Sequence, residues 1–433
     1  MTRAVLIAAP SSGSGKTTLT LGLLRALSRR GHAVRGAKSG PDYIDPRFHE
    51  AACGQVCMNL DAWAMGPARL HSLAQSDTDS TLIIEGAMGL FDGAPSLDPT
   101  TDGKGACADL ARLFDIPVIL VVDASRMAQS IAAIVAGFVG HDPHVHIAGV
   151  ILNKIGSQRH LDMLKRALIP LGIPVLGAVP RSADIVHPDR HLGLVQAQER
   201  DDLDLFLNTV ADSVAAHVDL DAILSLATDL SLATELAPNT TPRTPPAQSI
   251  AVAQDDAFAF AYPHLLADWH AQGAEISFFS PLADQAPPPA ALTYLPGGYP
   301  ELHAGRLASN HHFMQGLREA AARRTVYGEC GGYMILGDGM IDAKGQRHKM
   351  AGLLGLETSF ETRKLHLGYR SVHSNGGPFQ GQWHAHEFHY ATTVKAAGTA
   401  LFTATDAMDQ NLPDAGLING SVSGSFMHLI DHA

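Results

Sequence analysis

A segment with the residue types of a phosphate-binding loop lies near the N-terminus, where residues 10–18 read PSSGSGKTT after a short apolar run. Backbone N–H groups of such a loop surround phosphate oxygens, and the lysine reaches the β- and γ-phosphates of a nucleotide. The predicted nucleotide-binding residues of this loop are Ser12, Gly13, Ser14, Gly15, Lys16, Thr17 and Thr18. Pro10 occupies the position where the motif usually begins with glycine. A plain glycine-rich turn between a strand and a helix is the alternative interpretation.

Acidic residues that can hold a metal ion follow two other apolar segments. Glu85 ends the apolar run at 81–85, and Asp42 lies in the sequence KSGPDYIDP at 38–46. A carboxylate at the C-terminal end of a parallel strand is well placed to bind Mg²⁺ beside a phosphate site. We therefore predict Thr17, Glu85 and Asp42 as ligands of Mg²⁺. Solvated acids in turns are the alternative.

Three further polar residues have predicted roles at the same sheet edge. Asp45 and Asp92 are predicted to contact the substrate, although turn formation alone also explains acids beside glycine and proline. Asn153 ends the apolar run at 147–153, and its side chain is predicted to hydrogen-bond the adenine edge of a nucleotide. A helix cap is the alternative role for Asn153.

A second chemical site is centred on Cys330, in the sequence GECGG at 328–332. This G-x-C-x-G pattern is typical of a sharp turn between a strand and a helix that exposes a nucleophile. The glycines permit the turn, and the N-terminus of the following helix is expected to lower the pKa of the thiol. We predict Cys330 as a nucleophile, with the backbone N–H groups of Gly298 and Gly331 as its oxyanion hole. A buried structural cysteine is the alternative.

A cysteine nucleophile needs a base, and several histidines lie in the second half of the chain. In glutamine-hydrolysing domains the base lies near the C-terminus, which favours His428. Many such domains carry glutamate two residues after this histidine, but Ile430 occupies that position and Asp431 follows it. The third member of the site is therefore left unassigned. His386 and His389 form an alternative metal pair that has no clear third ligand.

The first half of the chain alternates apolar runs with segments of helical spacing. The runs lie at 4–9, 81–85, 117–123, 147–153 and 174–180, and the helical segments at 17–30, 127–139 and 159–171. Fully apolar strands that alternate with helices predict an α/β fold with a doubly wound parallel sheet. We place this domain at 1–236, a Pro- and Thr-rich linker at 237–249, and a second α/β domain with partly antiparallel strands at 250–433.

The composition excludes several classes of protein. The chain has 433 residues with 31 basic and 43 acidic side chains, a formal net charge of −12, which argues against a general nucleic-acid partner. No apolar stretch is long enough for a membrane span, and no signal peptide precedes the glycine-rich loop. Four irregularly spaced cysteines do not predict a disulfide framework. We therefore expect a cytoplasmic protein without a membrane partner.

Several segments together give the chain a resemblance that no single motif carries. They read APSSGSGKTT, KSGPDYIDP, EGAMGLFDG, PDRHLGLV, LPGGYPE, YGECGGYM and HEFHY. Taken together, they resemble the cobyrinic acid and hydrogenobyrinic acid a,c-diamide synthase family over essentially the whole length. The resemblance implies a dethiobiotin-synthetase-like P-loop domain followed by a class I glutamine amidotransferase-like α/β domain.

The resemblance also implies a reaction. ATP would phosphorylate the a and c acetate carboxylates of a corrinoid polycarboxylate, and ammonia released from glutamine by Cys330 and His428 would displace the phosphate. Arg190 and His191 are implied as carboxylate partners. Two alternatives are amidation of a related tetrapyrrole, such as a nickel sirohydrochlorin or other corrinoid side chains, and a non-catalytic P-loop partner protein. The oligomeric state is left open, with a homodimer as one option.

Overall fold

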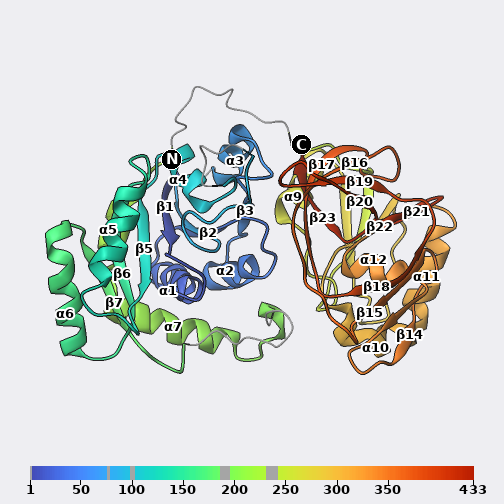
Figure 1. Ribbon diagram of the computed structural model, residues 1–433. Coiled ribbons are helices and arrows are strands. Elements are labelled where there is room, and N and C mark those ends of the chain that lie inside the picture. Colours follow the sequence, from blue (N-terminus) through green and yellow to red (C-terminus); the bar gives the residue numbers. More distant parts are fainter. Residues whose placement is uncertain (1, 76–78, 98–102, 186–195, 231–241) are drawn as a thin grey trace. The chain divides into compact units, whose positions relative to one another are not determined.

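The chain folds into two compact units, Met1–Thr240 and Thr241–Ala433 (Figure 1). The computed structural model describes residues 2–75, 79–97, 103–185, 196–230 and 242–433. Part of the predicted linker, residues 237–241, lies outside the described residues. The described part resumes at 242, and the first strand of the second unit begins at Ser249.

A parallel sheet forms the centre of the first unit. Its strands in spatial order are β3 (Met58–Leu60), β2 (Val34–Ser39), β4 (Thr81–Glu85), β1 (Arg3–Ala8), β5 (Val118–Asp123), β6 (Ile147–Ile155) and β7 (Val175–Pro180). A short strand, β8 (Thr228–Asp229), pairs antiparallel with β1. The central strands are almost wholly buried, as their continuous apolar runs predict for a sheet that is covered on both faces.

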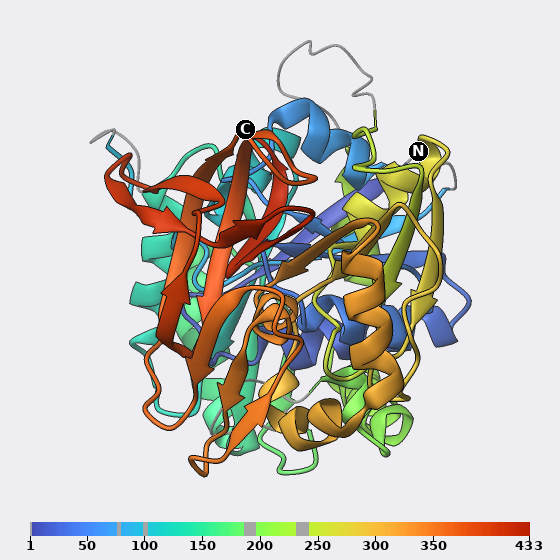
Figure 2. The same ribbon diagram turned by 90° about the vertical axis from the view of Figure 1, so that its right-hand side faces the viewer.

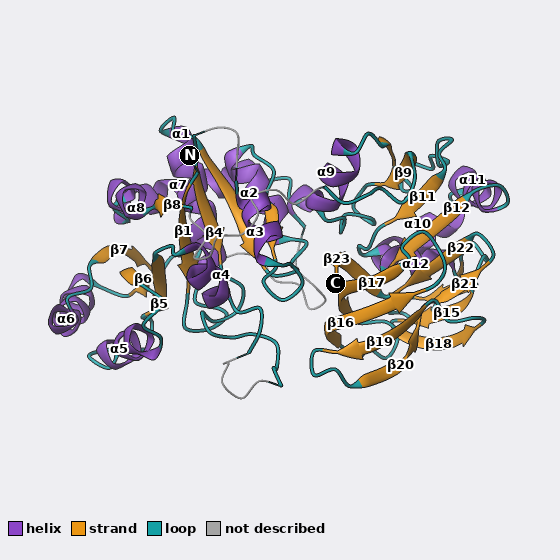
Figure 3. Cartoon of the chain, turned by 90° about the horizontal axis from the view of Figure 1, so that it is seen from above, coloured by secondary structure: helices purple, strands orange, loops and turns teal. Residues whose placement is uncertain are grey.

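Helices cover both faces of this sheet (Figure 3). They are α1 (Lys16–Arg29), α2 (Asp45–Cys53), α3 (Pro67–Ala74), α4 (Cys107–Phe114), α5 (Ile131–His141), α6 (Gln158–Leu168), α7 (Leu203–His217) and α8 (Leu220–Leu226). In α1 the leucines at 19, 23, 24 and 27 are buried, which confirms the helical spacing read from the sequence. The helix predicted at 159–171 ends at Leu168, and a 3₁₀ turn that contains Pro170 follows.

The second unit combines a mostly parallel sheet with two smaller sheets. The larger sheet has the order β10 (Glu275–Phe279), β9 (Ser249–Ala253), β11 (Leu292–Leu295), β12 (Thr325–Glu329), β22 (Val422–Ser425) and β21 (Leu417–Asn419). The helices of this unit are α9 (Pro263–Ala271), α10 (Ala304–Ser309), α11 (His311–Ala321) and α12 (Gly331–Leu336), with a 3₁₀ turn η3 at Pro300–His303. A core of apolar side chains from these strands and helices supports the turn between β12 and α12.

The later strands of the second unit pair mainly antiparallel, in agreement with their sequence. One sheet consists of β20 (Asn411–Ala415), β19 (Phe402–Asp406), β16 (His366–Ser374), β17 (Gly381–His389) and β23 (Met427–His432). The other consists of β14 (Arg347–Lys349), β13 (Gly339–Ile341), β15 (Gly355–Ser359) and β18 (Thr392–Ala397). Both can be followed in the orange and red ribbon of Figure 2. Among the described residues, no helix is both long and apolar enough to cross a bilayer.

Candidate active sites

The loop between β1 and α1 is held in shape by the end of β6. Gly15 has a φ of 89° and directly precedes α1. Asn153 Nδ2 donates a hydrogen bond to the Ser14 carbonyl at 2.9 Å, and Lys154 Nζ donates one to the Gly13 carbonyl at 2.9 Å. A Cβ on Gly15 would lie 2.2 Å from Asn153 Nδ2, so only glycine fits both the backbone angle and the space. This contact positions Asn153 against the loop. Its predicted hydrogen bond to adenine stays a prediction.

A cavity of about 740 Å³ opens at this loop. The predicted nucleotide and metal residues that line it are Ser12, Gly13, Gly15, Lys16, Thr17, Thr18, Asp42, Glu85 and Asn153. Asp45, predicted to contact the substrate, lines it as well. Ser14 is instead buried, with its hydroxyl donating to the Ser11 carbonyl at 2.9 Å. Asp92 is not among the lining residues, and its Oδ2 accepts the backbone N–H of Gly89 at 2.7 Å. The turn-forming alternative therefore accounts for the observed contact of Asp92.

Oxygen ligands converge beneath the loop. Thr17 Oγ1 lies 2.6 Å from Glu85 Oε1 and 3.4 Å from Asp45 Oδ2. The Lys38 ammonium bridges the same two acids, with Nζ 2.8 Å from Glu85 Oε1 and 2.5 Å from Asp45 Oδ2. Two carboxylates and a hydroxyl that lie within hydrogen-bond reach of one another are the donor set of a hard cation. Asp45, which the sequence assigned to substrate, is thus the carboxylate that joins Thr17 and Glu85.

Asp42, predicted as a metal ligand, hydrogen-bonds the backbone at the start of α2. Its Oδ1 accepts the backbone N–H groups of Ile44 and Asp45, at 2.7 and 3.1 Å, at the start of α2. Burial and the neighbouring charge of Asp45 raise the pKa of Asp42 to about 6. The side chain lines the cavity and also fixes the turn before α2.

Charges in the cluster support one another. Burial alone would raise the pKa of Glu85, but Lys38 and a hydrogen bond from His49 hold it below its usual range. Burial opposes the charge on Lys38, yet Asp45 and Glu85 outweigh it and raise the pKa of the ammonium group. His49 Nε2 lies 2.6 Å from Glu85 Oε2, and both side chains are fully buried. The buried carboxylate is therefore ionised and held in place from two sides.

Three residues of this site were not singled out from the sequence. Lys38 is the penultimate residue of β2. A lysine at the end of an apolar strand could have indicated a partner for the predicted acids. His49 follows Asp45 by four residues and so lies on the same face of α2. Lys154 follows Asn153 and ion-pairs with Asp123, Nζ to Oδ2, at 2.6 Å. Arg190 and His191, the predicted carboxylate partners, lie outside the described residues.

Cys330 sits on the sharp turn that its glycines predict. Its backbone has a φ of 46° and a ψ of −102°, between the end of β12 and the start of α12. The Cys330 N–H donates to the Ser425 carbonyl at 2.8 Å, and Sγ lies 3.8 Å from the Phe388 carbonyl oxygen. A Cβ on Gly328 would lie 2.6 Å from the Gly332 backbone, so the strand and the helix approach too closely for any side chain there.

A glycine loop contacts both partners of the predicted glutaminase site. A Cβ on Gly297 would lie 2.2 Å from Cε1 of His428. A Cβ on Gly331 would lie 3.1 Å from the backbone nitrogen of Gly298. The loop at 297–298 therefore packs against the imidazole on one side and the start of α12 on the other. The two predicted oxyanion-hole residues are neighbours in space.

The thiol and the imidazole are both buried. Burial, with a contribution from Glu301, raises the pKa of the Cys330 thiol above its ordinary value. The expectation that the helix N-terminus lowers this pKa is therefore wrong for the protein without substrate, because burial outweighs the backbone N–H of Gly331. Burial also lowers the pKa of His428. The resting pair is a neutral thiol and a neutral imidazole, which leaves the imidazole able to accept a proton.

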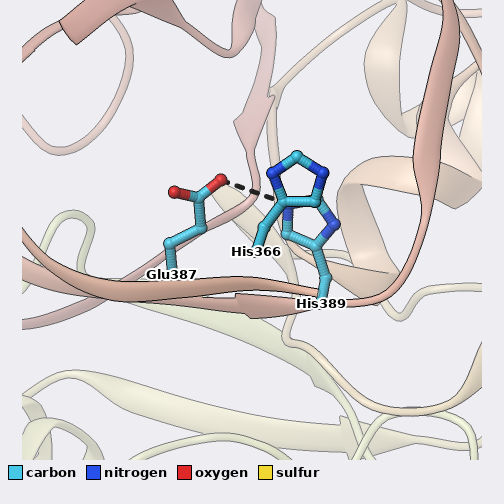
Figure 4. A group of neighbouring side chains, drawn as sticks. All are labelled: His366, Glu387 and His389. Carbon is cyan, nitrogen blue, oxygen red and sulfur yellow. Dashed lines mark hydrogen bonds and ion pairs between the residues drawn. The ribbon is translucent and has the colours of Figure 1, made fainter. Parts of the chain in front are cut away.

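The alternative metal pair, His386 and His389, does not form one group of possible ligands. Within the described residues, His366, Glu387 and His389 bring possible ligand atoms within 4.8 Å of one another, and His386 is not a member (Figure 4). The rings of His366 and His389 stack, with centroids 4.5 Å apart and planes 6° apart. Ring nitrogens bind metals in the plane of the ring, so two parallel rings do not direct lone pairs at one ion. Glu387 also ion-pairs with Arg370, Oε2 to a guanidinium nitrogen, at 2.7 Å.

Comparison with known proteins identifies both units. Residues 5–194 match the model of the CobQ/CobB/MinD/ParA nucleotide binding domain, and residues 249–433 match that of the CobB/CobQ-like glutamine amidotransferase domain. The first match confirms that the cavity belongs to an ATP-using P-loop domain.

Relatives match along the whole chain. Proteins named hydrogenobyrinate a,c-diamide synthase from Brucella anthropi and Brucella suis are each 56% identical, over 98% of this chain and 98% of theirs. The protein of that name from Rhodobacter capsulatus is 51% identical over 99% of this chain and 98% of its own length. The chain therefore belongs to the hydrogenobyrinate a,c-diamide synthase family, glutamine-dependent ligases that form amides in cobalamin biosynthesis.

Proposed function

We propose that this protein uses ATP and glutamine to convert the a and c acetate carboxylates of hydrogenobyrinic acid into amides. The observation that carries the proposal is the pairing, in one chain, of the acid and lysine cluster under the P-loop with the strained Cys330 turn. The first centre has groups that activate a carboxylate, and the second has groups that release ammonia. The names of the relatives support the cobalt-free ring as the substrate.

Activation of the carboxylate is the task of the first centre. A carboxylate does not react with ammonia until its oxygen has become a leaving group. A carboxylate oxygen attacks the γ-phosphorus of ATP, ADP departs, and an acyl phosphate results. Lys16 and the loop N–H groups stabilise the charge on the transferring phosphate. Ammonia then attacks the acyl carbon, inorganic phosphate departs, and the amide nitrogen loses a proton.

The oxygen cluster fits Mg²⁺. Thr17, Glu85 and Asp45 would hold the ion, because the Thr17 hydroxyl and the two carboxylates converge on one another beside Lys38. When bound, Mg²⁺ would neutralise phosphate charge. Lys38 and His49 fix the orientation of Glu85 from opposite sides. Asp42, predicted as a ligand, would act by shaping the turn that presents Asp45.

Release of ammonia is the task of the second centre. Cys330 Sγ attacks the side-chain carbonyl carbon of glutamine while His428 accepts the thiol proton. The backbone N–H groups of Gly298 and Gly331 would stabilise the oxyanion. His428 returns the proton to the departing nitrogen, which leaves as ammonia, and water hydrolyses the thioester to glutamate. The buried, neutral resting pair suits this proton transfer because no charge needs to be held before substrate arrives.

Mass spectrometry of the purified protein with ATP, glutamine and each candidate ring tests the substrate assignment. We expect products with one and then two amides from hydrogenobyrinic acid. Cobyrinic acid and nickel sirohydrochlorin, incubated in parallel, measure selectivity for the ring. Efficient amidation of either ring, with none of hydrogenobyrinic acid, would contradict the proposed substrate.

Replacement of the nucleophile tests the division of labour. Cys330→Ala should abolish amidation with glutamine, because no other group can form the thioester. The same variant should keep amidation with ammonium chloride, which bypasses the second centre. Steady-state rates with each nitrogen donor check this expectation. Loss of both activities would contradict the assigned role of Cys330.

A further inference from the structure

The carboxylate that follows His428 in the sequence is already engaged elsewhere. Ile430, two residues after His428, carries no carboxylate. Asp431, the next residue, is fully buried, and its Oδ1 lies 2.6 Å from Nε of Arg243. The guanidinium group neutralises this carboxylate. Asp431 is therefore a poor source of negative charge for the imidazole.

Another buried carboxylate approaches the imidazole from the strand that carries the nucleophile. Oε2 of Glu329 lies 3.9 Å from Nδ1 of His428, and the two side chains are 2% and 0% exposed. Glu329 is the last residue of β12 and directly precedes Cys330. Its neighbour in the chain is the nucleophile and its neighbour in space is the base.

The groups around Glu329 hold it in this position. The Tyr294 hydroxyl donates to Oε2 at 2.9 Å, and the Leu429 backbone N–H points at Oε1 at 3.4 Å. Both donors are neutral, and Leu429 follows His428 on β23. In the part of the chain that the structure describes, His428 is the one basic side chain that pairs with Glu329. Burial of a carboxyl group is costly unless it is hydrogen-bonded or paired, so its place here requires a reason.

We propose that Glu329 is the positioning residue of His428 in the glutaminase reaction described above: its carboxylate, 3.9 Å from Nδ1, stabilises the imidazolium form and leaves Nε2 for the Cys330 thiol. This inference rests on the proposed function. The proton that moves from Sγ to Nε2 creates a positive charge on a buried ring. A carboxylate beside Nδ1 stabilises that charge, as the acid of a catalytic triad does. The third member would then come from the nucleophile strand instead of the strand of the base.

Glu329 has two opposite electrostatic effects. Burial raises the pKa of Glu329 to about 8, so its charge is present in the carboxylate form that prevails above that pH. That charge favours the imidazolium of His428, but it also disfavours a thiolate on Cys330. The titratable groups around the three residues are Tyr294 on β11, Tyr327 on β12, Glu301 on η3, and His386, Glu387 and His389 on β17. The two effects shift the reactivity of Cys330 in opposite directions, so a pH profile separates them.

The first experiment measures steady-state rates. Above pH 8, where the carboxylate form of Glu329 prevails, Glu329→Gln keeps the shape of the side chain and removes its charge. At that pH, kcat with glutamine should fall about 10²-fold while KM for glutamine stays unchanged. Amidation with ammonium chloride should keep its wild-type rate. Asp431→Asn is the matched control, a second buried carboxylate near the base, and should retain activity with glutamine. A wild-type kcat in Glu329→Gln, or an equal loss in Asp431→Asn, would overturn the proposal.

The second experiment measures the rate at which iodoacetamide alkylates Cys330 as a function of pH. If Glu329 supports the imidazolium, Glu329→Gln moves the profile to higher pH, because the ion pair of thiolate and imidazolium is lost. If Glu329 acts only by repelling the thiolate, the profile moves to lower pH and the proposal is wrong. An unfolded second unit would give the profile of an ordinary exposed thiol.

If Glu329→Gln unfolds the second unit, Glu329→Asp replaces it, because the shorter side chain moves the charge away from His428. Its kcat should fall and its alkylation profile should move to higher pH, and wild-type behaviour would overturn the proposal. The Cys330→Ala variant separates the two levels of inference. Activity of that variant with glutamine would contradict the proposed function. A normal response of Cys330→Ala together with a normal Glu329→Gln contradicts only the role of Glu329.

Discussion

Lys16 is predicted to contact phosphate, and its side-chain hydrogen bond goes to the backbone and not to the acid cluster. Its Nζ donates to the backbone carbonyl of Met88, whereas Lys38 bridges the two carboxylates. Burial lowers the pKa of Lys16. Lys16→Ala should therefore reduce amidation at least about 10²-fold with either glutamine or ammonium chloride as donor, since phosphoryl transfer precedes both. Rates with the two donors check this, and wild-type amidation with ammonium chloride would contradict the role.

The protonation of Glu329 should be visible in stability as well as in rate. Burial raises its pKa from 4.5 to about 8, so the folded protein binds this proton more tightly than the unfolded chain does. The stabilisation is complete below pH 4.5 and is lost as pH rises toward 8. The free energy of unfolding in urea should fall with pH by at most about 1.4 kcal/mol per pH unit from this group. Glu329→Gln should flatten the curve, and an identical slope in both proteins would contradict the assignment.

At the scale of elements, the loop before η3 is the part that sets the imidazole in place. A Cβ on Gly297 would overlap the ring of His428, at 2.2 Å from Cε1. Gly297→Ala should displace the ring and cost about 1–3 kcal/mol of stability, as overpacking usually does. Activity with glutamine should fall while activity with ammonium chloride persists.

Gly305→Ala in α10 is the control for this substitution, because its Cβ would meet only His348 at an ordinary 3.5 Å. Thermal unfolding and the two rates measure both variants. Equal behaviour of Gly297→Ala and Gly305→Ala would show that the loop does not position His428.

The sequence predicted elements and motifs better than it predicted the partners of side chains. Apolar runs identify the strands of the parallel sheet, because a strand buried on both faces has little choice of residue. The turn at Cys330 is equally predictable from the sequence, since only glycine tolerates the close contacts around it. The cluster under the P-loop could not be predicted, because Lys38 and Asp45 come together through the packing of α2 on β2, which no local sequence pattern encodes. Asp45 thus joins the cluster predicted for metal, and Asp42 accepts backbone N–H groups at the start of α2.

At the scale of the whole molecule, the two centres belong to different compact units of one chain. In the proposed reaction, ammonia released at Cys330 has to reach the acyl phosphate with its lone pair free, because ammonium cannot attack carbon. We expect one amide to form for each glutamine hydrolysed, with little ammonia in the medium. Measurement of glutamate, amide and free ammonia in one reaction gives the ratio. Free ammonia that accumulates well beyond the amide formed would argue against a sheltered transfer.

The hold of β6 on the phosphate loop has a consequence for affinity. Asn153 and Lys154 tie down two carbonyls of the loop without any help from a nucleotide. The conformational entropy of ordering these residues is therefore lost during folding and not again at each binding event. ATP would therefore bind a loop that is already ordered, so more of the attraction between loop and phosphate is available as binding free energy. In the proposed reaction, each of the two amidations would start from the same ordered phosphate loop.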